Sequence, residues 1–402
     1  MAEPAAKRAN WTSVAFGDVV RLYKERSCDP EADGFERYVG LEHLDPGDPK
    51  IRSWGSVADG TTFTNVFRAG QVLFGKRRAY QRKVAVADFS GVCSGDIYVF
   101  ESKDPTVLLP SLLQFVCQTD AFFDHAVGTS AGSLSPRTNW KSLATYEFAL
   151  PPLEEQRRIV EACSSAWRCV EAASDARRAG ESARKSLICF LYQGGASTEP
   201  RRKSPMGSLP GSWQVAPLGD RYEVQLGKMM SSAAREGPNQ VPYIRNANVQ
   251  WNALDLEDVA TMNFSDAERK KFELRSGDIL ACEGRHVGKS ALWRDETPGA
   301  CYQKALHRIR RLGELDVSEY LLHCLQYYSW AGRFVAATGE TTIPHLPAER
   351  LRAMLFPFPP REQQEAIAGT IRAMDESLDG LSRRVLRARE VLSCLLQTEG
   401  WS

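Results

Sequence analysis

Residues 150–191 read LPPLEEQRRIVEACSSAWRCVEAASDARRAGESARKSLICFL, and residues 358–399 read FPPREQQEAIAGTIRAMDESLDGLSRRVLRAREVLSCLLQTE. Each stretch opens on a proline pair, Pro151-Pro152 or Pro359-Pro360, and continues with an acidic, glutamine-bearing turn. Proline cannot continue a helix but is tolerated in its first turn, where acidic residues also suit the positive end of the helix dipole. Because the proline pairs lie 208 residues apart in a chain of 402, we predict an internally duplicated protein.

Other phrases of the sequence recur in the same order. Their offset drifts only from 202 to 208 residues, which a few insertions explain. The matched phrases are Trp11–Asp18 with Trp213–Asp220, Tyr38-Val39 with Tyr243-Ile244, and Phe67–Leu73 with Leu274–Leu280. Shared order at a nearly constant offset indicates that the duplication covers the whole chain.

The bulk composition is that of a soluble globular protein of two or three domains, with 43% hydrophobic and 25% charged residues. The first residues lack an apolar stretch, and no run is long enough to span a membrane, so we expect a cytoplasmic protein without a membrane partner. Ten cysteines without a CxxC pair indicate reduced, buried thiols and predict no metal site. A net charge of +1 excludes a simple polycation, so any nucleic-acid contact must be local.

The first globule, residues 1–150, combines strand-like runs with one helical stretch. The strand signals are 37–41, 71–74 and 95–100, and the helical stretch is 110–123. This pattern predicts a mixed α+β domain. A dense basic cluster follows the second run and has two possible interpretations, a solvated turn or a nucleic-acid contact. We favour the contact, and its candidate residues are Lys76, Arg77, Arg78, Tyr80, Arg82 and Lys83.

Residues 151–195 form the predicted central helix, which Gly194-Gly195 ends. Residues 196–212 are rich in Pro, Ser and Gly without periodicity, which predicts a linker. The second globule, residues 213–357, repeats the α+β pattern, and residues 358–402 form the last helix. Within residues 302–311 we expect a strand with His307 or Arg308 on one face and apolar residues on the other.

The second globule carries Gly284–Ser290 where the first has its basic loop. Its tail is similar to a phosphate-binding loop, but Glu283 stands where the first glycine is needed, and only three residues separate the two glycines. We therefore reject nucleotide binding. Arg285, His286 and Lys289 remain candidates for contact with a DNA backbone or base edge.

The last helix has an unbroken heptad seam, which favours packing against another helix. Its apolar residues follow a 4,3 spacing: Ile367, Ile371, Met374, Leu378, Leu381, Val385, Ala388, Leu392 and Leu395. The central helix offers Ile159, Val170 and Leu187 but is interrupted around residues 176–180. We expect the two helices to form an antiparallel coiled coil, each roughly 50 Å long, with the halves related by a pseudo-twofold axis. This seam is also the candidate surface for partner docking.

No H-E-x-x-H, G-x-S-x-G, metal-ligand spacing or intact cofactor loop is present, so we predict no catalytic residues. Pro151–Ile159 and Pro359–Ile367 resemble the helix starts of the specificity (S) subunits of type I restriction-modification enzymes. Arg275–Leu280 and Gly339–Leu346 are similar to phrases of that family's target-recognition domains, whereas Gly128–Leu134 departs from the second phrase. The resemblance extends over essentially the whole chain.

The resemblance implies a non-catalytic DNA reader in phage defence. Two target-recognition domains would each read one half of a split, asymmetric site on double-stranded DNA, and the helices would set the gap. Two methyltransferase subunits would methylate adenine with S-adenosylmethionine, and ATP- and Mg-dependent restriction subunits would cleave, so this chain itself would bind no cofactor. Two alternatives stay open: a structural adaptor of another defence assembly with the same architecture, and an NTPase or nuclease built on Gly284–Ser290.

Overall fold

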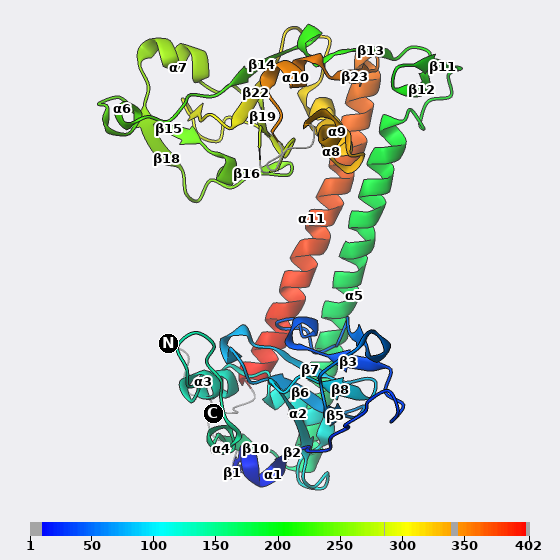
Figure 1. The fold of residues 1–402 in the computed structure, drawn as a ribbon, viewed down its shortest axis with the longest axis vertical. Helices are drawn as coiled ribbons and strands as arrows, with labels where there is room; N and C mark the ends of the chain where they lie inside the picture. The colour runs from blue at the N-terminus through cyan, green and yellow to red at the C-terminus, as the bar shows by residue number, and fades with distance from the viewer. Residues whose placement is uncertain (1–9, 285, 339–344, 399–402) are drawn as a thin grey trace. The chain divides into compact units, whose positions relative to one another are not determined.

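The computed structural model describes residues 10–284, 286–338 and 345–398. The chain forms two compact units, residues 1–176 with 381–402 and residues 177–380. Two long helices, α5 (Leu153–Tyr192) and α11 (Arg361–Thr398), each contribute one end to the first unit and the other end to the second (Figure 1). Both helices begin directly after a proline pair, as predicted. They are parts of the two units rather than separate segments.

The first unit holds an antiparallel pair and two four-stranded sheets. The pair is β1 (Thr12–Ala15) with β10 (Glu147–Leu150). One sheet has the order β2 (Val20–Leu22), β9 (Ile97–Ser102), β6 (Val72–Gly75), β7 (Val84–Val86). The other is β4 (Gly55–Ser56), β3 (Arg37–Val39), β8 (Gly91–Cys93), β5 (Asn65–Phe67). The helices are α1 (Phe16–Val19), η1 (Leu41–His43), η2 (Val57–Asp59), η3 (Ala79–Gln81), α2 (Pro110–Val116), α3 (Asp120–Gly128) and α4 (Trp140–Leu143).

The second unit repeats this plan. Its antiparallel pair is β13 (Gln214–Pro217) with β23 (Leu355–Phe358). Its sheets are β14 (Tyr222–Leu226), β22 (Leu306–Arg311), β19 (Ile279–Cys282), β20 (Ser290–Leu292), then β18 (Ala260–Asn263), β15 (Gln240–Ile244), β21 (Cys301–Tyr302), and the pair β16 (Val249–Gln250), β17 (Ala253–Leu254). The helices are η4 (Leu218–Asp220), α6 (Ser232–Glu236), η5 (Asn246–Asn248), α7 (Asp266–Phe272), α8 (Ser318–Trp330), α9 (Arg333–Thr338) and α10 (Ala348–Ala353).

Matched details confirm the predicted duplication and α+β class. Tyr38 lies in a parallel pairing of β3 with β8, and Tyr243 lies in the parallel pairing of β15 with β21. Gly70 and Gly277 both have a φ near 90°, and each precedes the residue that closes a turn with its side chain. These turns are matched because the Arg68 N–H donates to Gln71 Oε1 at 2.7 Å and the Arg275 N–H donates to Asp278 Oδ2 at 2.8 Å.

The ends of the two long helices are built into the cores of the units. In the first unit Ile159 and Val170 of α5 share a core with Leu392 of α11. In the second unit Ile188 of α5 shares a core with Ile367 and Ile371 of α11. Within each unit the two helices run in opposite directions (Figure 1). The predicted antiparallel pairing is therefore present in both units, and sheet and helix residues also pack against it.

Two local predictions were wrong. Residues 196–212 are not a linker throughout, because β11 (Arg201–Ser204) and β12 (Gly207–Pro210) form a hairpin whose turn is Pro205-Met206. Gly207, the first residue after this turn, has a φ of +100°. The helical stretch 110–123 is broken into α2 and α3, since the Thr119 side chain caps a new helix by accepting from the Phe122 N–H. The predicted strand within residues 302–311 is present as β22, and its His307 and Arg308 are both buried, at 0% and 2% exposure.

Candidate nucleic-acid interface

The two predicted contact loops occupy the same place in the repeated fold. Residues 76–83 join β6 to β7, and residues 283–289 join β19 to β20. In the first unit the Thr138 N–H donates to the Lys76 carbonyl at 3.0 Å, and in the second the Leu346 N–H donates to the Glu283 carbonyl at 2.8 Å. Each loop is thus held against the segment that follows α3 or α9. Structure and sequence agree on which loops correspond.

The hydrogen bonds show which residue of the first unit stands at the position of Leu346. It is Thr138, not Leu134. Thr138 and Leu346 are 208 residues apart, the offset that also separates the two proline pairs. The predicted departure of Gly128–Leu134 from Gly339–Leu346 is therefore no difference in length, because the counterpart of 339–346 is 131–138.

The backbone of the first loop is tightly wound. Arg78 and Arg82 both adopt the left-handed conformation, with φ of 54° and 55°, on either side of η3. The Arg78 N–H donates to the Pro136 carbonyl at 2.7 Å, which ties the loop to its neighbour. Ala79 is buried under this turn, whereas the Tyr80 ring is 55% exposed. The loop therefore presents an aromatic ring at its tip.

Part of the positive charge of this loop is used inside the first unit. Arg77 Nη1 lies 3.5 Å from Asp96 Oδ2, and Arg82 Nη2 lies 2.5 Å from Asp120 Oδ1. The Lys83 ammonium donates to the Leu41 carbonyl at 2.6 Å. The sequence therefore overstates the charge that faces outward.

Asp96 is the carboxylate that organises this region. Arg137 Nε donates to Asp96 Oδ1 at 2.8 Å, and this hydrogen bond lowers the pKa of Asp96 despite partial burial. Of the remaining cations, Lys76 places Nζ 4.7 Å from the Tyr98 ring centre, and Arg78 reaches the Ser135 hydroxyl at 3.3 Å. Within the described part of the chain, neither has an acidic partner. Lys76 and Arg78 are thus the loop residues with uncompensated charge.

A groove of about 530 Å³ continues from Lys76 across the first unit. Lys24 and Arg26 line it together with Tyr23 and Asn65. Both cations are exposed, and neither forms an ion pair with the described residues. They are not among the predicted contact residues, because in sequence they form only a short mixed-charge run around Glu25. Only the fold brings them to the side of Lys76.

The loop of the second unit offers different chemistry. Arg285 lies outside the described residues, and His286 is exposed. The Lys289 ammonium donates to Gln250 Oε1 at 3.2 Å. Glu283, at the position of Lys76, is buried and lies 3.2 Å from His345 Nε2. The two loops therefore share a backbone place but differ in charge.

His307 is structural. Its Nε2 lies 2.9 Å from the Leu346 carbonyl, and burial lowers its pKa. The ring supports the segment that holds the second loop.

A buried glutamine at each helix start joins the helix to its globule. Gln156 Oε1 accepts from the Leu109 N–H, which precedes α2, at 2.9 Å, and its Nε2 donates to the Pro151 carbonyl at 2.8 Å. Gln364 Oε1 accepts from the Val317 N–H, which precedes α8, also at 2.9 Å, and its Nε2 donates to the Pro359 carbonyl at the same distance. Both side chains are almost fully buried. The glutamine of the repeated motif therefore links the start of each long helix to its globule by hydrogen bonds.

The predicted docking residues fall into two groups. Five are buried in the core of their own unit: Ile159, Val170, Ile367, Ile371 and Leu392. Five are half-buried: Leu187, Met374, Leu378, Leu381 and Val385. The buried group stabilises the fold, so only the half-buried group has surface that a partner can touch.

Within residues 10–284, 286–338 and 345–398, no group of three or more His, Cys, Asp or Glu side chains is placed to hold a metal ion. The same residues contain no helix that is both long and apolar enough to cross a membrane.

The family model described as the type I restriction modification DNA specificity domain matches residues 9–173 and, a second time, residues 210–386. The chain belongs to this family. The two matches fall on the two halves of the duplication. DNA recognition is therefore the role of this specificity chain, and its family is the non-catalytic recognition part of assemblies with other restriction-modification subunits.

Relatives of the specificity chain carry the same assignment. It is 21% identical over 388 residues to the type I restriction enzyme MjaVIII specificity subunit of Methanocaldococcus jannaschii, covering 92% of this chain and 87% of the relative. It is 30% identical over 160 residues to the type I restriction enzyme EcoDI specificity subunit of Escherichia coli, covering 38% of this chain and 33% of the relative.

Solved structures support the fold of the specificity chain. A chain from a structure of the complex assembly and conformational transition of a type I R-M system matches with a TM-score of 0.62 and 21% identity, covering 98% of both chains. The type I restriction-modification S subunit from M. genitalium matches with a TM-score of 0.57 and 13% identity, covering 98% of this chain and 96% of the other.

Proposed function

We propose that each unit of this specificity chain reads one half of a split, asymmetric DNA site and that α5 and α11 set the gap between the halves. The observation that carries the proposal is the pair of equivalent loops with different charge, at residues 76–83 and 283–289. Equivalent loops with unlike side chains would read unlike base sequences. An α-helix of 40 residues is about 60 Å long, more than the ~34 Å turn of B-DNA.

The catalytic work would belong to partner subunits. Two methyltransferase subunits would use S-adenosylmethionine to methylate adenine, and restriction subunits would use ATP and Mg²⁺ for cleavage. This chain would bind none of these cofactors. Its near-neutral net charge is consistent with that division, since partner subunits would supply part of the affinity for DNA.

Methylome sequencing tests the proposal in cells with and without this gene. We expect a bipartite adenine-methylation motif that disappears on deletion and returns when the gene is restored. The control is a strain that lacks the gene for the methyltransferase subunit, which should lose the same motif. An unchanged methylome after deletion, in cells that express the methyltransferase subunit, would contradict the proposed role.

We infer that Arg77 and Arg78 contact the DNA backbone. Replacing both by Ala should weaken binding in the assembled complex and reduce the salt dependence by about one released counterion per lost phosphate contact. Anisotropy titrations at two salt concentrations measure both quantities. Arg158→Ala, an exposed arginine of α5 outside the loop, is the control. If affinity and salt slope do not change, the loop does not contact DNA.

A further inference from the structure

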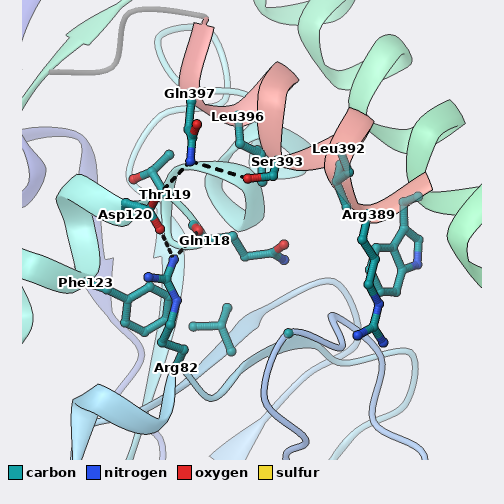
Figure 2. Close-up of a pocket in the computed structure, with 13 residues that line it drawn as sticks. Arg82, Gln118, Thr119, Asp120, Phe123, Arg389, Leu392, Ser393, Leu396 and Gln397 are labelled. Carbon is teal, nitrogen blue, oxygen red and sulfur yellow. Dashed lines mark hydrogen bonds and ion pairs between the residues drawn. The ribbon is translucent and has the colours of Figure 1, made fainter. Parts of the chain in front are cut away.

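A pocket of about 210 Å³ opens in the first unit between the globule and the last turns of α11. Val84, Phe123, Trp167, Leu392 and Leu396 give it apolar walls. Arg82 and Arg389 lie on opposite sides of it (Figure 2). The pocket thus combines apolar walls with two cations, and neither the predicted DNA loops nor the helix seam accounts for it.

Two buried donors at this pocket have no acceptor. Gln118 Nε2 and Trp167 Nε1 are both shielded from solvent, and neither has a hydrogen-bond partner among the described residues. Figure 2 shows the Gln118 amide directed into the pocket, between Arg82 and Arg389. A buried polar group without a partner costs about 1–3 kcal/mol. An occupant that accepts hydrogen bonds would recover this free energy.

The charges at the rim favour an anion. The Arg82 guanidinium is neutralised by Asp120, whose other oxygen accepts from Gln397 Nε2 at 2.9 Å. Arg389 is exposed and has no acidic partner in the described part of the chain. The pocket therefore holds one uncompensated positive charge beside two unused N–H donors.

The equivalent place in the second unit is closed by polar side chains. Arg184 donates to Gln326 Oε1 at 2.8 Å and forms a two-point ion pair with Asp375. Asn252 Nδ2 donates to Asp375 Oδ2 at 3.2 Å. These four residues bind one another, and among the described residues none of their buried side-chain donors or acceptors lacks a hydrogen-bond partner.

Each residue of that polar cluster has a counterpart at the first unit's pocket. Gln326 and Asp375 correspond to Gln118 and Trp167 at an offset of 208 residues, and Arg184 corresponds to Leu392. Asn252 corresponds to Gly47, and both have a positive φ, of 58° and 70°. Leu in place of Arg and Gly in place of Asn remove the atoms that fill the space. The first unit therefore has a pocket where the second unit has this polar cluster, which we call the polar plug. Of the four residues of the plug, only the glutamine is kept in the first unit, as Gln118.

We propose that this pocket binds a small organic anion, a carboxylate carried on a flat apolar ring. Both donors are covered in this structure, so binding would include a side-chain movement that turns Gln118 Nε2 and Trp167 Nε1 toward the carboxylate. The carboxylate would also face Arg389, and the ring would lie against the apolar walls. In the first unit, such a ligand would fill the space that the polar plug fills in the second unit. The site goes beyond DNA recognition, and because Arg82 belongs to the loop 76–83, occupancy would also stabilise the base of that loop.

Fluorine NMR of the full chain labelled with 5-fluorotryptophan tests this proposal, with benzoate as the probe. The Trp167 resonance is assigned by its loss in Trp167→Phe. We expect benzoate to shift this resonance saturably and neutral benzyl alcohol to bind at least about tenfold more weakly, which is about 1.4 kcal/mol. Gln118→Leu and Arg389→Gln should each weaken benzoate binding by about tenfold.

Arg387→Gln is the matched control, because Arg387 is an exposed arginine of α11 that does not line the pocket. It should bind benzoate as the wild type does. No saturable shift of Trp167 at tens of millimolar benzoate would overturn the proposal, as would equal binding of benzoate by wild type, Gln118→Leu and Arg389→Gln. A shift produced only by an added methyltransferase subunit would also overturn it and would assign the pocket to a protein side chain.

Discussion

Single residues at equivalent positions change the chemistry of the two units while the backbone stays the same. Lys76 in the first unit corresponds to the buried Glu283 in the second, and both use their carbonyls to hold the neighbouring segment. Phe115 and His323 are another such pair, 208 residues apart and both buried in a helix. An exchange of this kind leaves the fold intact but introduces a titratable group into a core.

His323 should make the second unit sensitive to acid. Burial lowers the pKa of His323 to about 4, with a smaller contribution from the nearby Arg184. The unfolded chain, with a pKa near 6.5, takes up this proton first as the pH falls. The free energy of unfolding is therefore unaffected by this proton above about pH 6.5. As the pH falls from there toward 4, the free energy of unfolding decreases by up to about 1.4 kcal/mol per pH unit.

Urea unfolding at pH 7.5 and pH 5 measures this effect. His323→Phe, which installs the residue of the first unit, should lose less stability between the two pH values than the wild type does. Its counterpart Phe115→Leu, a change without a titratable group, should leave the pH dependence unchanged. Equal pH dependence in wild type and His323→Phe would show that His323 does not titrate differently on unfolding.

At the scale of elements, the repeated proline-glutamine motif determines how each long helix meets its globule. The prolines start the helix, and the glutamine then holds the backbone that leads into α2 or α8. Trp11 Nε1 and Trp213 Nε1 add a second matched contact, donating at 2.8 Å to Glu155 and Gln363. Two matched contacts at each junction fix the direction in which the helix leaves.

Removing Gln364 should destabilise the second unit strongly. Gln364→Leu leaves the Val317 N–H and the Pro359 carbonyl buried without this partner, at about 1–3 kcal/mol for each group. The free energy of unfolding from urea titration should fall by at least about 2 kcal/mol. Glu365→Ala, which removes only an exposed ion pair with Arg361, should cost less than about 1 kcal/mol. A similar decrease of the free energy of unfolding in both variants would show that Gln364 does not hold the helix to its globule.

The sequence predicts the repeated elements well because each has a local cause. Proline pairs mark the helix starts, and Gly70 and Gly277 mark turns that need a positive φ. The charge of the first loop could not be predicted, because Asp96 and Asp120 reach it only through the fold. The groove at Lys24 and the loss of the polar plug at Trp167 are likewise visible only when distant segments are brought together.

For the whole molecule, the consequence of duplication is two similar units that share two continuous helices. The seam residues near the helix ends, such as Ile371 and Leu392, are buried in globular cores, whereas Leu378 and Leu381 in the middle of α11 are half-buried. The ends therefore anchor the units, and the middle is the part of the helix where a change leaves both cores untouched. A test of whether the helices set the gap between the half-sites therefore belongs there.

Replacing Leu378 and Leu381 by Asp should abolish recognition of a site with a fixed gap. Charged side chains at half-buried seam positions cost about 1–3 kcal/mol each and oppose close helix packing. Methylome sequencing of cells that carry the variant should show the bipartite motif lost, while circular dichroism shows helical content near that of the wild type. Ser377→Asp with Arg384→Asp, both at exposed positions of α11, should leave the motif intact. A bipartite motif retained with an unchanged gap would show that this seam does not set the spacing.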